Sequence, residues 1–182
     1  FHGLIGNARW RGVALRNILG EARILDGGEE VVFFGGDIGA EEIRETEVEQ
    51  AFARSLPVSD AMRSENMLAM EMNGEVLPQI HGRPVRLLVP GYYGVANVKW
   101  LVQIHVQDRR YMGKFMGRDY VTLKKETIGG QDRWVENSVT KIHLKSSIVR
   151  VTKSGSQHKI TGFVLNDGTA IRNVEIKIDD GP

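Results

Sequence analysis

The chain has 182 residues and no cysteine; 41% of its residues are hydrophobic, 26% are charged, and the formal net charge at pH 7 is +1. This composition is typical of a globular protein, and because the charge is nearly balanced we expect neither a nucleic-acid partner nor broad attraction to an acidic membrane. The sequence has no apolar run long enough for a transmembrane span, and without cysteine it offers no disulfide, thiolate nucleophile or thiolate metal ligand.

Both ends of the sequence indicate a longer natural chain. The N-terminus reads FHGLIGNARW, without an initiator methionine, and the C-terminus reads NVEIKIDDGP, an alternating segment that stops at a turn. A strand followed by such a turn normally leads into a partner strand. We therefore expect further residues before Phe1 and after Pro182.

The first part of the chain predicts one helix and one buried strand. Residues 31–34 read VVFF and are closed by two glycines, a pattern typical of a short buried strand. Residues 12–24 predict the helix, because their apolar residues recur at helical spacing: Val13, Leu15, Ile18, Leu19 and Ala22.

The next segment is harder to interpret. Residues 40–53, AEEIRETEVEQAFA, are acidic and only weakly periodic, so they predict either a helix or an excursion loop. Residues 55–65, SLPVSDAMRSE, predict a loop followed by a short helix. Ser59 or Asp60 is the candidate N-cap of that helix.

Three strands follow. Residues 66–78, NMLAMEMNGEVLP, predict a strand that runs into a hairpin turn at Asn73-Gly74, because both residue types tolerate positive φ. Residues 84–91 and 98–108 predict the second and third strands. The segment 111–123 that comes next predicts a loop or an edge strand.

The character of the sequence changes after a polar stretch, KKETIGGQDRWVENS, in which we place a linker at residues 127–137. Beyond it, short alternating segments are separated by turns at Ser154-Gly155, Asn166-Asp167-Gly168 and Asp179-Asp180-Gly181. Turns about 8–12 residues apart are typical of a β-sandwich. The sequence contains only about the first half of such a domain.

Familiar catalytic motifs are absent from the sequence. It has no Gly-x-Ser-x-Gly nucleophile elbow, no P-loop and no dinucleotide fingerprint. The histidines lie far apart, so no catalytic triad is indicated. His105 and His143 occupy polar positions of alternating strands, where a surface histidine is the ordinary interpretation.

The most distinctive local feature is the segment HGRPVRLLVPGYYGVANVKW, in which His81, Arg83, Arg86 and Lys99 flank an apolar run with turns in its middle. A phosphate pocket needs fixed donors such as an Arg fork, a Lys charge and an imidazole, usually beside loop amides. The spacing allows such a pocket, and it equally allows a solvated strand face. The tripeptide at 118–120, Arg-Asp-Tyr, could also contact an anion but carries no weight alone.

These segments, taken together, resemble the sulfite oxidase family of molybdenum–molybdopterin enzymes. The same order and similar spacing are found there for IGNARWRGVALRNIL, VVFFGGD, MLAMEMNGEVLPQIHGRPVRLLVPGYYGVANVKWL and GRDYV. The resemblance covers about residues 3–123, and the trailing VEIKIDDGP resembles the start of that family's immunoglobulin-like dimerisation domain.

The resemblance implies an α+β fold with mixed sheets, followed by part of an Ig-like β-sandwich. Residues 1–126 would then belong to the molybdopterin-binding domain and residues 138–182 to the dimerisation domain. For the cofactor's terminal phosphate, the resemblance implies a pocket with His81 and Arg86 as the holding pair, completed by Asn97, Val98 and the charge of Lys99.

Two further roles are implied by position in the family's motifs. Asp37, at the end of VVFFGGD, matches an acidic residue that contacts the pterin. Tyr120 matches the active-site tyrosine that hydrogen-bonds near the equatorial oxo ligand of molybdenum. No metal ligand is expected from these residues, because the family's molybdenum-ligating cysteine and its upstream substrate-binding arginines precede the matched segment.

The function that the resemblance implies is oxidation of sulfite to sulfate, with electrons passed to a cytochrome or another acceptor, in a homodimer of periplasmic location. Related alternatives are oxygen-atom transfer with a sulfoxide or nitrate, and a cofactor-free structural or dimerising module of the same fold. Two departures from the family pattern stand out: Met70 replaces an aromatic residue, and residues 163–168 read FVLNDG in place of AWS-G. Without the upstream cysteine, we expect this chain alone to be inactive.

Overall fold

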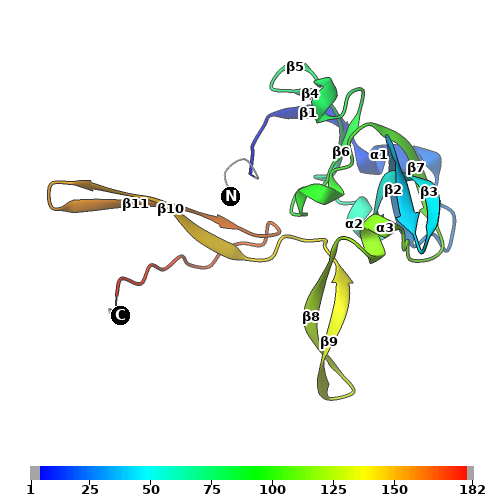
Figure 1. Ribbon diagram of the computed structural model, residues 1–182. Helices are drawn as coiled ribbons and strands as arrows, with labels where there is room; N and C mark the ends of the chain where they lie inside the picture. The colour runs from blue at the N-terminus through cyan, green and yellow to red at the C-terminus, as the bar shows by residue number, and fades with distance from the viewer. Residues whose placement is uncertain (1–4, 180–182) are drawn as a thin grey trace. The chain divides into compact units, whose positions relative to one another are not determined.

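The structure is a computed structural model that describes residues 5–179, and the chain divides into two compact units, Phe1–Thr140 and Lys141–Pro182. Each is described by itself (Figure 1). All strand pairs among the described residues are antiparallel, and the helices between the strands are few and short. The elements in chain order are β1 (Trp10–Ala14), α1 (Leu15–Ala22), β2 (Glu30–Ile43), β3 (Thr46–Pro57), α2 (Val58–Ala61), β4 (Met67–Met72), β5 (Glu75–Val76), η1 (Gln79–His81), β6 (Arg86–Leu88), η2 (Gly94–Ala96), β7 (Leu101–Gln107), α3 (Lys114–Gly117), β8 (Val121–Ile128), β9 (Gln131–Ser138), β10 (Lys145–Ser154) and β11 (Gln157–Leu165).

The larger unit contains a sheet in the order β3-β2-β7. The buried strand predicted at 31–34 is confirmed: it forms the N-terminal part of β2, and Val31, Val32 and Phe33 are fully buried between two partner strands. Hydrophobic side chains on both faces explain why this segment reads as a continuous apolar run.

The acidic segment 40–53 is neither a helix nor a loop, so that prediction is wrong. Its residues continue β2 and begin β3 as one long hairpin, in which Glu41 pairs with Val48 and Ile43 with Thr46. The turn residues Arg44 and Glu45 both have positive φ, at 48° and 64°. This is the backbone geometry of a two-residue hairpin turn, built here without the usual Asn or Gly.

A second sheet has the order β1-β4-β5, with β6 also paired to β4. The predicted Asn73-Gly74 turn is confirmed, because the two residues have φ values of 57° and 91° and Met72 pairs with Glu75 across the turn. The Asn73 carboxamide oxygen also accepts a hydrogen bond from the Arg9 backbone at 2.9 Å. The turn is therefore tied to the strand beside it.

The helices are shorter than the sequence predicts. Of the predicted helix at 12–24, only Leu15–Ala22 is helical, and Val13 lies in strand β1. The N-cap prediction of Ser59 or Asp60 is wrong, since α2 begins at Val58 and Pro57 precedes it. The extended strand β3 runs up to Pro57, whose fixed φ suits the entry to a helix.

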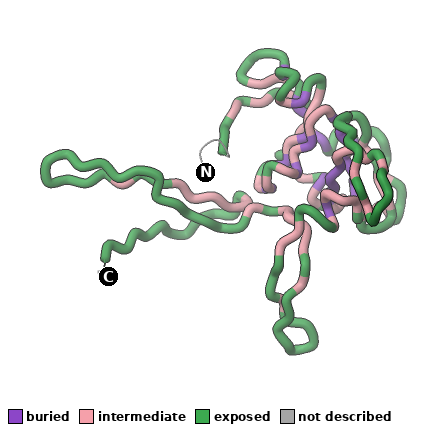
Figure 2. The backbone as a smooth tube through the Cα atoms, viewed as in Figure 1, coloured by how far each residue is buried: buried purple, intermediate pink, exposed green. Residues whose placement is uncertain are grey.

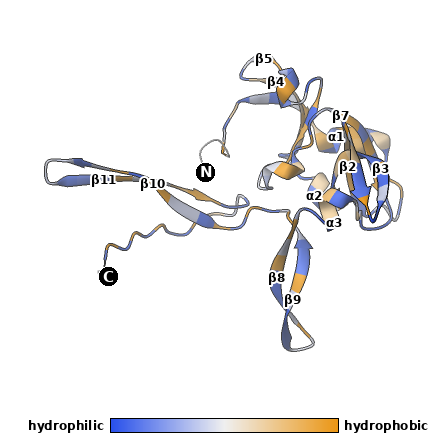
Figure 3. Cartoon of the chain, viewed as in Figure 1, coloured by the Kyte–Doolittle hydropathy of each residue, from blue (hydrophilic) through white to orange (hydrophobic). Residues whose placement is uncertain are grey.

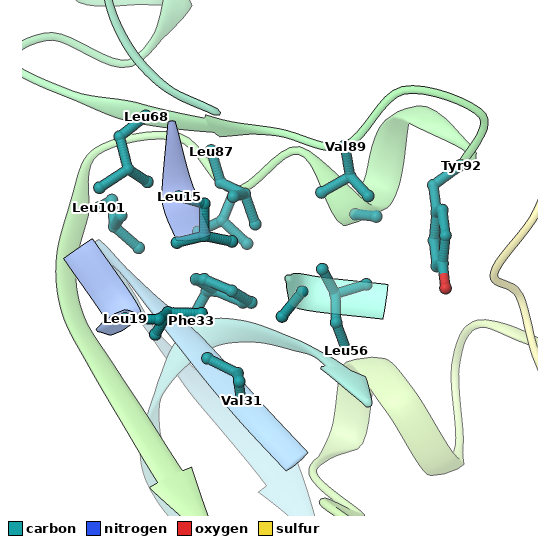
Figure 4. Close-up of a cluster of buried hydrophobic side chains, with 13 residues drawn as sticks. Leu15, Leu19, Val31, Phe33, Leu56, Leu68, Leu87, Val89, Tyr92 and Leu101 are labelled. Atoms are coloured by element: carbon teal, nitrogen blue, oxygen red, sulfur yellow. The ribbon is translucent and has the colours of Figure 1, made fainter. Parts of the chain in front are cut away.

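One hydrophobic core joins both sheets and α1 (Figure 4). In the close-up, Phe33 lies near the middle of the cluster, with Leu15 and Leu87 on one side of it and Val31 on the other. The buried members of this core are Leu15, Leu19, Val31, Phe33, Leu56, Ala61, Leu68, Leu87, Val89, Tyr92, Ala96, Val98 and Leu101. Several of them come from the segments after β6, so core packing also holds those segments.

The predicted linker at 127–137 is instead part of a hairpin formed by β8 and β9. Gly129 and Gly130 have φ values of 60° and 76° and form its turn, with Ile128 paired to Gln131. The hairpin is largely exposed, as Figure 2 shows, which explains its polar composition. The division between the units falls after Thr140.

The smaller unit contains the hairpin β10–β11, with the predicted turn at Ser154-Gly155 confirmed. The turn at 166–168 is also confirmed, since the Gly168 amide donates to Asn166 Oδ1 at 3.0 Å. Apolar residues along the hairpin are exposed, among them Ile148, Val149 and Val151 (Figure 3).

The predicted C-terminal strand at 174–178 is wrong, because residues 169–178 form no regular element. A strand needs a neighbour for its backbone groups, and within the described part of this unit only β10 and β11 pair. A complete sandwich is therefore not formed by these residues. The Asp180-Gly181 part of the last predicted turn lies outside the described residues.

Candidate functional site

Arg86 connects two loops of the larger unit. Its Nη1 donates to the His81 carbonyl at 3.0 Å, and its Nη2 donates to the Asn97 carbonyl at 3.3 Å. The guanidinium carbon lies 5.1 Å from the centre of the Trp10 ring, a cation–π distance. Burial lowers the pKa of Arg86 from its ordinary value, yet the side chain stays charged at neutral pH.

The loop that carries His81 lies directly against the one that carries Lys99. Gly82 has a φ of 110°, and a Cβ added there would lie 2.8 Å from the Lys99 Cβ. The Trp100 amide donates to the Gly82 carbonyl at 3.2 Å. Lys99 Nζ donates to the Ile80 carbonyl at 3.3 Å and lies 4.1 Å from the Trp100 ring centre. Only glycine permits this approach at position 82.

Asp37 reaches the same place from strand β2. The Gly36 amide donates to the Trp100 carbonyl at 2.7 Å. A Cβ on Gly35 would collide with Asp37 Oδ1 and would lie 3.0 Å from the Lys99 carbonyl oxygen. The carboxylate of Asp37 therefore folds back beside the Lys99 backbone.

Asn97 and Val98 shape the loop between η2 and β7. Asn97 Oδ1 accepts a hydrogen bond from the Val89 amide at 2.6 Å, and its Nδ2 donates to the Gly94 carbonyl at 3.3 Å. Val98 is 1% exposed and belongs to the core, so its side chain faces away from solvent. Its carbonyl accepts from the Leu87 amide at 2.8 Å.

The structure thus brings together six of the positions singled out in the sequence, and we call the set Asp37, His81, Arg86, Asn97, Val98 and Lys99 the loop cluster. Within it, the Nε of Arg86 is buried and has no hydrogen-bond partner among the described residues. A buried donor without a partner is rare and calls for an explanation. His81, Arg86 and Lys99 are all half-buried. A cation set of this kind suits a phosphate group.

Tyr120 lies apart from the loop cluster. Its ring is 6.5 Å from the Phe115 ring and 6.0 Å from the guanidinium carbon of Arg54, and its side chain is exposed to solvent. Its carbonyl accepts a hydrogen bond from the Val139 amide at 2.8 Å. Among residues 5–179, no hydrogen bond, ion pair or ring contact links Tyr120 to the loop cluster, so the structure shows two groups of predicted site residues.

Arg54 is the residue beside Tyr120 that sequence reasoning missed. It is 2% exposed, and it donates to the carbonyls of Phe115 and Val139. Burial, and after it the nearby Arg110 guanidinium, lowers the pKa of Arg54 to about 10. The signal was a single cation among the mainly apolar residues of the strand segment AFARSL.

A buried carboxylate holds the neighbouring segment in place. Glu30 is 3% exposed and accepts hydrogen bonds from Ser55 Oγ at 2.8 Å and from the Tyr111 amide at 2.5 Å. Arg110 Nη1 lies 3.3 Å from Glu30 Oε1. These contacts leave the carboxylate well paired, and they fix the chain that leads to α3.

Other possible sites in the described residues are weaker. A surface pocket of about 480 Å³ is lined by residues 22–28 and 105–109, and it includes His105 but no residue of the loop cluster. No group of three or more His, Cys, Asp or Glu side chains in residues 5–179 could hold a metal ion. In the same part of the chain, no helix is long and apolar enough to cross a membrane.

A half-buried set of donors beside a glycine-permitted close contact, on a fold of antiparallel sheets, has the chemistry to hold an anionic group between loops. Residues 1–115 match the family model described as the oxidoreductase molybdopterin binding domain. The chain belongs to this family, and its sequence is similar to that of sulfite oxidases, as the resemblance predicted.

The relatives show the breadth of that group. The chain is 31% identical to mouse mitochondrial sulfite oxidase over 98% of its own length and 33% of that protein. It is 28% identical to a nitrate reductase [NADPH] of Pichia angusta over 94% of its length and 21% of that protein. The sulfane dehydrogenase SoxCD from Paracoccus pantotrophus has a similar fold, with a TM-score of 0.59 and 28% identity over 78% of this chain and 32% of that one.

The chain thus spans about one third of the length of the mammalian sulfite oxidases that it matches. The fold of this chain is similar to that of the sulfane dehydrogenase, as expected for a fold of the sulfite oxidase type. Family membership implies a molybdopterin cofactor, and the unpartnered Arg86 donor within a set of half-buried cations fits its phosphate.

Proposed function

We propose that this chain is part of an enzyme that oxidises sulfite to sulfate by oxygen-atom transfer at a molybdenum–molybdopterin cofactor. The observation that carries the proposal is the loop cluster, in which a half-buried Arg86 with an unpartnered Nε lies in the chain segment shared with sulfite oxidases. When bound, the cofactor supplies the transferable oxygen atom and accepts the electrons.

The loop cluster's role is to hold the cofactor by its terminal phosphate. Arg86 and Lys99 supply positive charge and His81 supplies an imidazole donor, and each charge-assisted hydrogen bond to phosphate contributes about 1.5–3 kcal/mol. Asn97 and Val98 hold the loop in shape, because Asn97 Oδ1 accepts a hydrogen bond from the Val89 amide and the Val98 carbonyl accepts one from the Leu87 amide. The carboxylate of Asp37 would contact the pterin from the side of β2.

Tyr120 acts on the substrate in this proposal. Its exposed phenol donates a hydrogen bond to a substrate oxygen and so orients the oxyanion and offsets part of its charge. The upstream cysteine of the family is not among these 182 residues. We therefore expect turnover from the full-length enzyme only.

A second candidate is oxygen-atom transfer with another substrate. The similarity to a nitrate reductase and to a sulfane dehydrogenase favours this alternative, and a sulfoxide is a further possibility in the same class. The alternative that is not an enzyme is a cofactor-free structural or dimerising module of the same fold. The main proposal includes a cytochrome as the electron acceptor and a periplasmic location. It also includes a homodimer formed through the smaller unit.

The first test is molybdenum per chain in the purified full-length protein, followed by sulfite and nitrate kinetics. About one atom per chain with sulfite turnover supports the proposal, whereas turnover of nitrate alone would select the second candidate. Absence of molybdenum in a host that makes the cofactor would favour the structural module.

A substitution in the loop cluster tests its role in holding the cofactor. Arg86→Ala in the full-length protein should lower pterin content, while Arg109→Ala, an exposed arginine outside the cluster, should leave it unchanged. Equal pterin content in both variants would remove Arg86 from the phosphate site.

A further inference from the structure

Arg54 is the largest fully buried side chain among the described residues. Burying a guanidinium is costly unless its hydrogen bonds are made inside the protein. Arg54 makes two such bonds, and its Nε has no partner. A buried cation that is incompletely paired needs a role beyond packing.

Both carbonyls that Arg54 binds belong to the immediate surroundings of Tyr120. One is that of Val139, whose amide donates at 2.8 Å to the Tyr120 carbonyl, so Arg54 and Tyr120 bind opposite sides of the same residue. The other is that of Phe115, whose ring lies 6.5 Å from the Tyr120 ring.

The third contact is direct. The guanidinium carbon of Arg54 lies 6.0 Å from the Tyr120 ring centre, at the outer limit of a cation–π contact. The ring of Tyr120 is thus bordered by the Arg54 cation and by the Phe115 ring, and its backbone is fixed through Val139. Strand β3 supplies Arg54, so one residue of the sheet holds the exposed tyrosine from the interior.

We propose that Arg54 is a positioning residue that holds the phenol of Tyr120 in its working orientation. The proposal rests on the proposed function for its catalytic consequence, but the placement of the ring can be measured without turnover. Arginine suits this task because its planar fork binds two carbonyls at a fixed angle, whereas a lysine ammonium is a single point on a flexible stem. Arg54→Lys therefore keeps the charge and loses the geometry.

The experiment uses the full-length protein with 3-fluorotyrosine at position 120, read by fluorine NMR, and with turnover measured on the unlabelled protein. The variants are Arg54→Lys and Arg54→Met. The matched control is Leu56→Ala, which lies two residues along the same strand and leaves a cavity in the core. All are compared at a temperature well below the lowest unfolding midpoint.

We expect one sharp fluorine line in the wild type and in Leu56→Ala, and a shifted or broadened line in both Arg54 variants. If Arg54→Met fails to fold, Arg54→Lys alone decides. An unchanged line in Arg54→Lys, or an equal change in Leu56→Ala, would overturn the proposal, since general loosening would then explain the effect.

Turnover gives the second readout. Arg54→Lys should lower kcat by about 10-fold or more with molybdenum content unchanged, because small misplacements of an orienting group cost rates of this order. In a Tyr120→Phe background the same change should cost less than about twofold, because residues that act as a unit are not additive. Fully additive losses would contradict the proposal.

Failure of the proposed function is recognisable separately. If Tyr120→Phe retains wild-type sulfite turnover, the catalytic role of Tyr120 is wrong. The fluorine line in the Arg54 variants then still decides whether Arg54 positions the ring.

Discussion

Replacing Arg86 by alanine tests the architecture of the loop cluster before any cofactor is involved. The change removes two hydrogen bonds, to the carbonyls of His81 and Asn97, and the contact with the Trp10 ring. The net contribution of each bond is about 1 kcal/mol, and the ring contact adds about 0.5–1 kcal/mol. The expected loss is therefore roughly 2–3 kcal/mol of unfolding free energy.

The assay is thermal unfolding of the cofactor-free protein, purified from a host that does not make molybdopterin. For a unit of this size, each kcal/mol of lost unfolding free energy lowers Tm by roughly 3–4 °C. The Tm of Arg86→Ala should therefore lie about 6–12 °C below that of the wild type. Arg86→Lys should recover little, because one ammonium cannot reach both carbonyls in the geometry of the fork.

The control is Arg11→Ala. The Arg11 side chain is 81% exposed and lies 3.4 Å from Glu71, and exposed ion pairs contribute about 0–1 kcal/mol. If the Arg86 and Arg11 variants unfold at the same temperature, Arg86 does not hold the two loops together. The structural reasoning about the cluster would then be refuted, whatever the pterin content.

Three further predictions follow from single features. Gly82→Ala should lower unfolding free energy by about 1–3 kcal/mol, because φ is 110° and the new Cβ would meet the Lys99 side chain; an unchanged Tm would contradict that crowding. Burial, with the hydrogen bond to Asp60 at 2.5 Å, raises the pKa of Tyr92 above its ordinary value of 10.0. The stability that Tyr92 contributes is therefore complete below pH 10 and decreases as pH rises beyond it, so the gap in unfolding free energy between wild type and Tyr92→Phe should narrow there. A gap that stays constant in denaturant titrations to higher pH would count against this linkage. Tyr120→Phe should lower sulfite turnover of the full-length enzyme while molybdenum content is retained, and equal kinetics would remove Tyr120 from catalysis.

The strands with strong local signals could be predicted from sequence, and those held by tertiary contacts could not. The pair Asn73-Gly74 predicted its hairpin correctly, because both residue types favour positive φ. Arg44-Glu45 adopt the same conformation without that signal, and the acidic strands beside them lack an apolar face. At Gly129-Gly130 a hairpin was predicted as a linker, because its turn glycines lie in a polar, exposed segment.

The candidate site divides in the same way. The loop cluster was predicted by resemblance to a family, and the structure brings its members into one place, although the side chain of Val98 belongs to the core. The role of each member stays a prediction. Arg54 carried no motif, and its importance depends on Phe115 and Val139, which lie 61 and 85 residues away in the chain. Such long-range bonds leave no local pattern to read.

The two bonds from Arg86 to the His81 and Asn97 carbonyls have a consequence for how the cofactor enters. Both loops are tied by the protein's own donors, so the receptor is preorganised and little conformational entropy remains to be lost on binding. Under the proposed function, the cofactor would bind to a preformed site, and the loops would not need to fold around it. Loading would then be limited by delivery and access, and apoprotein stored without cofactor should still be competent to take it up.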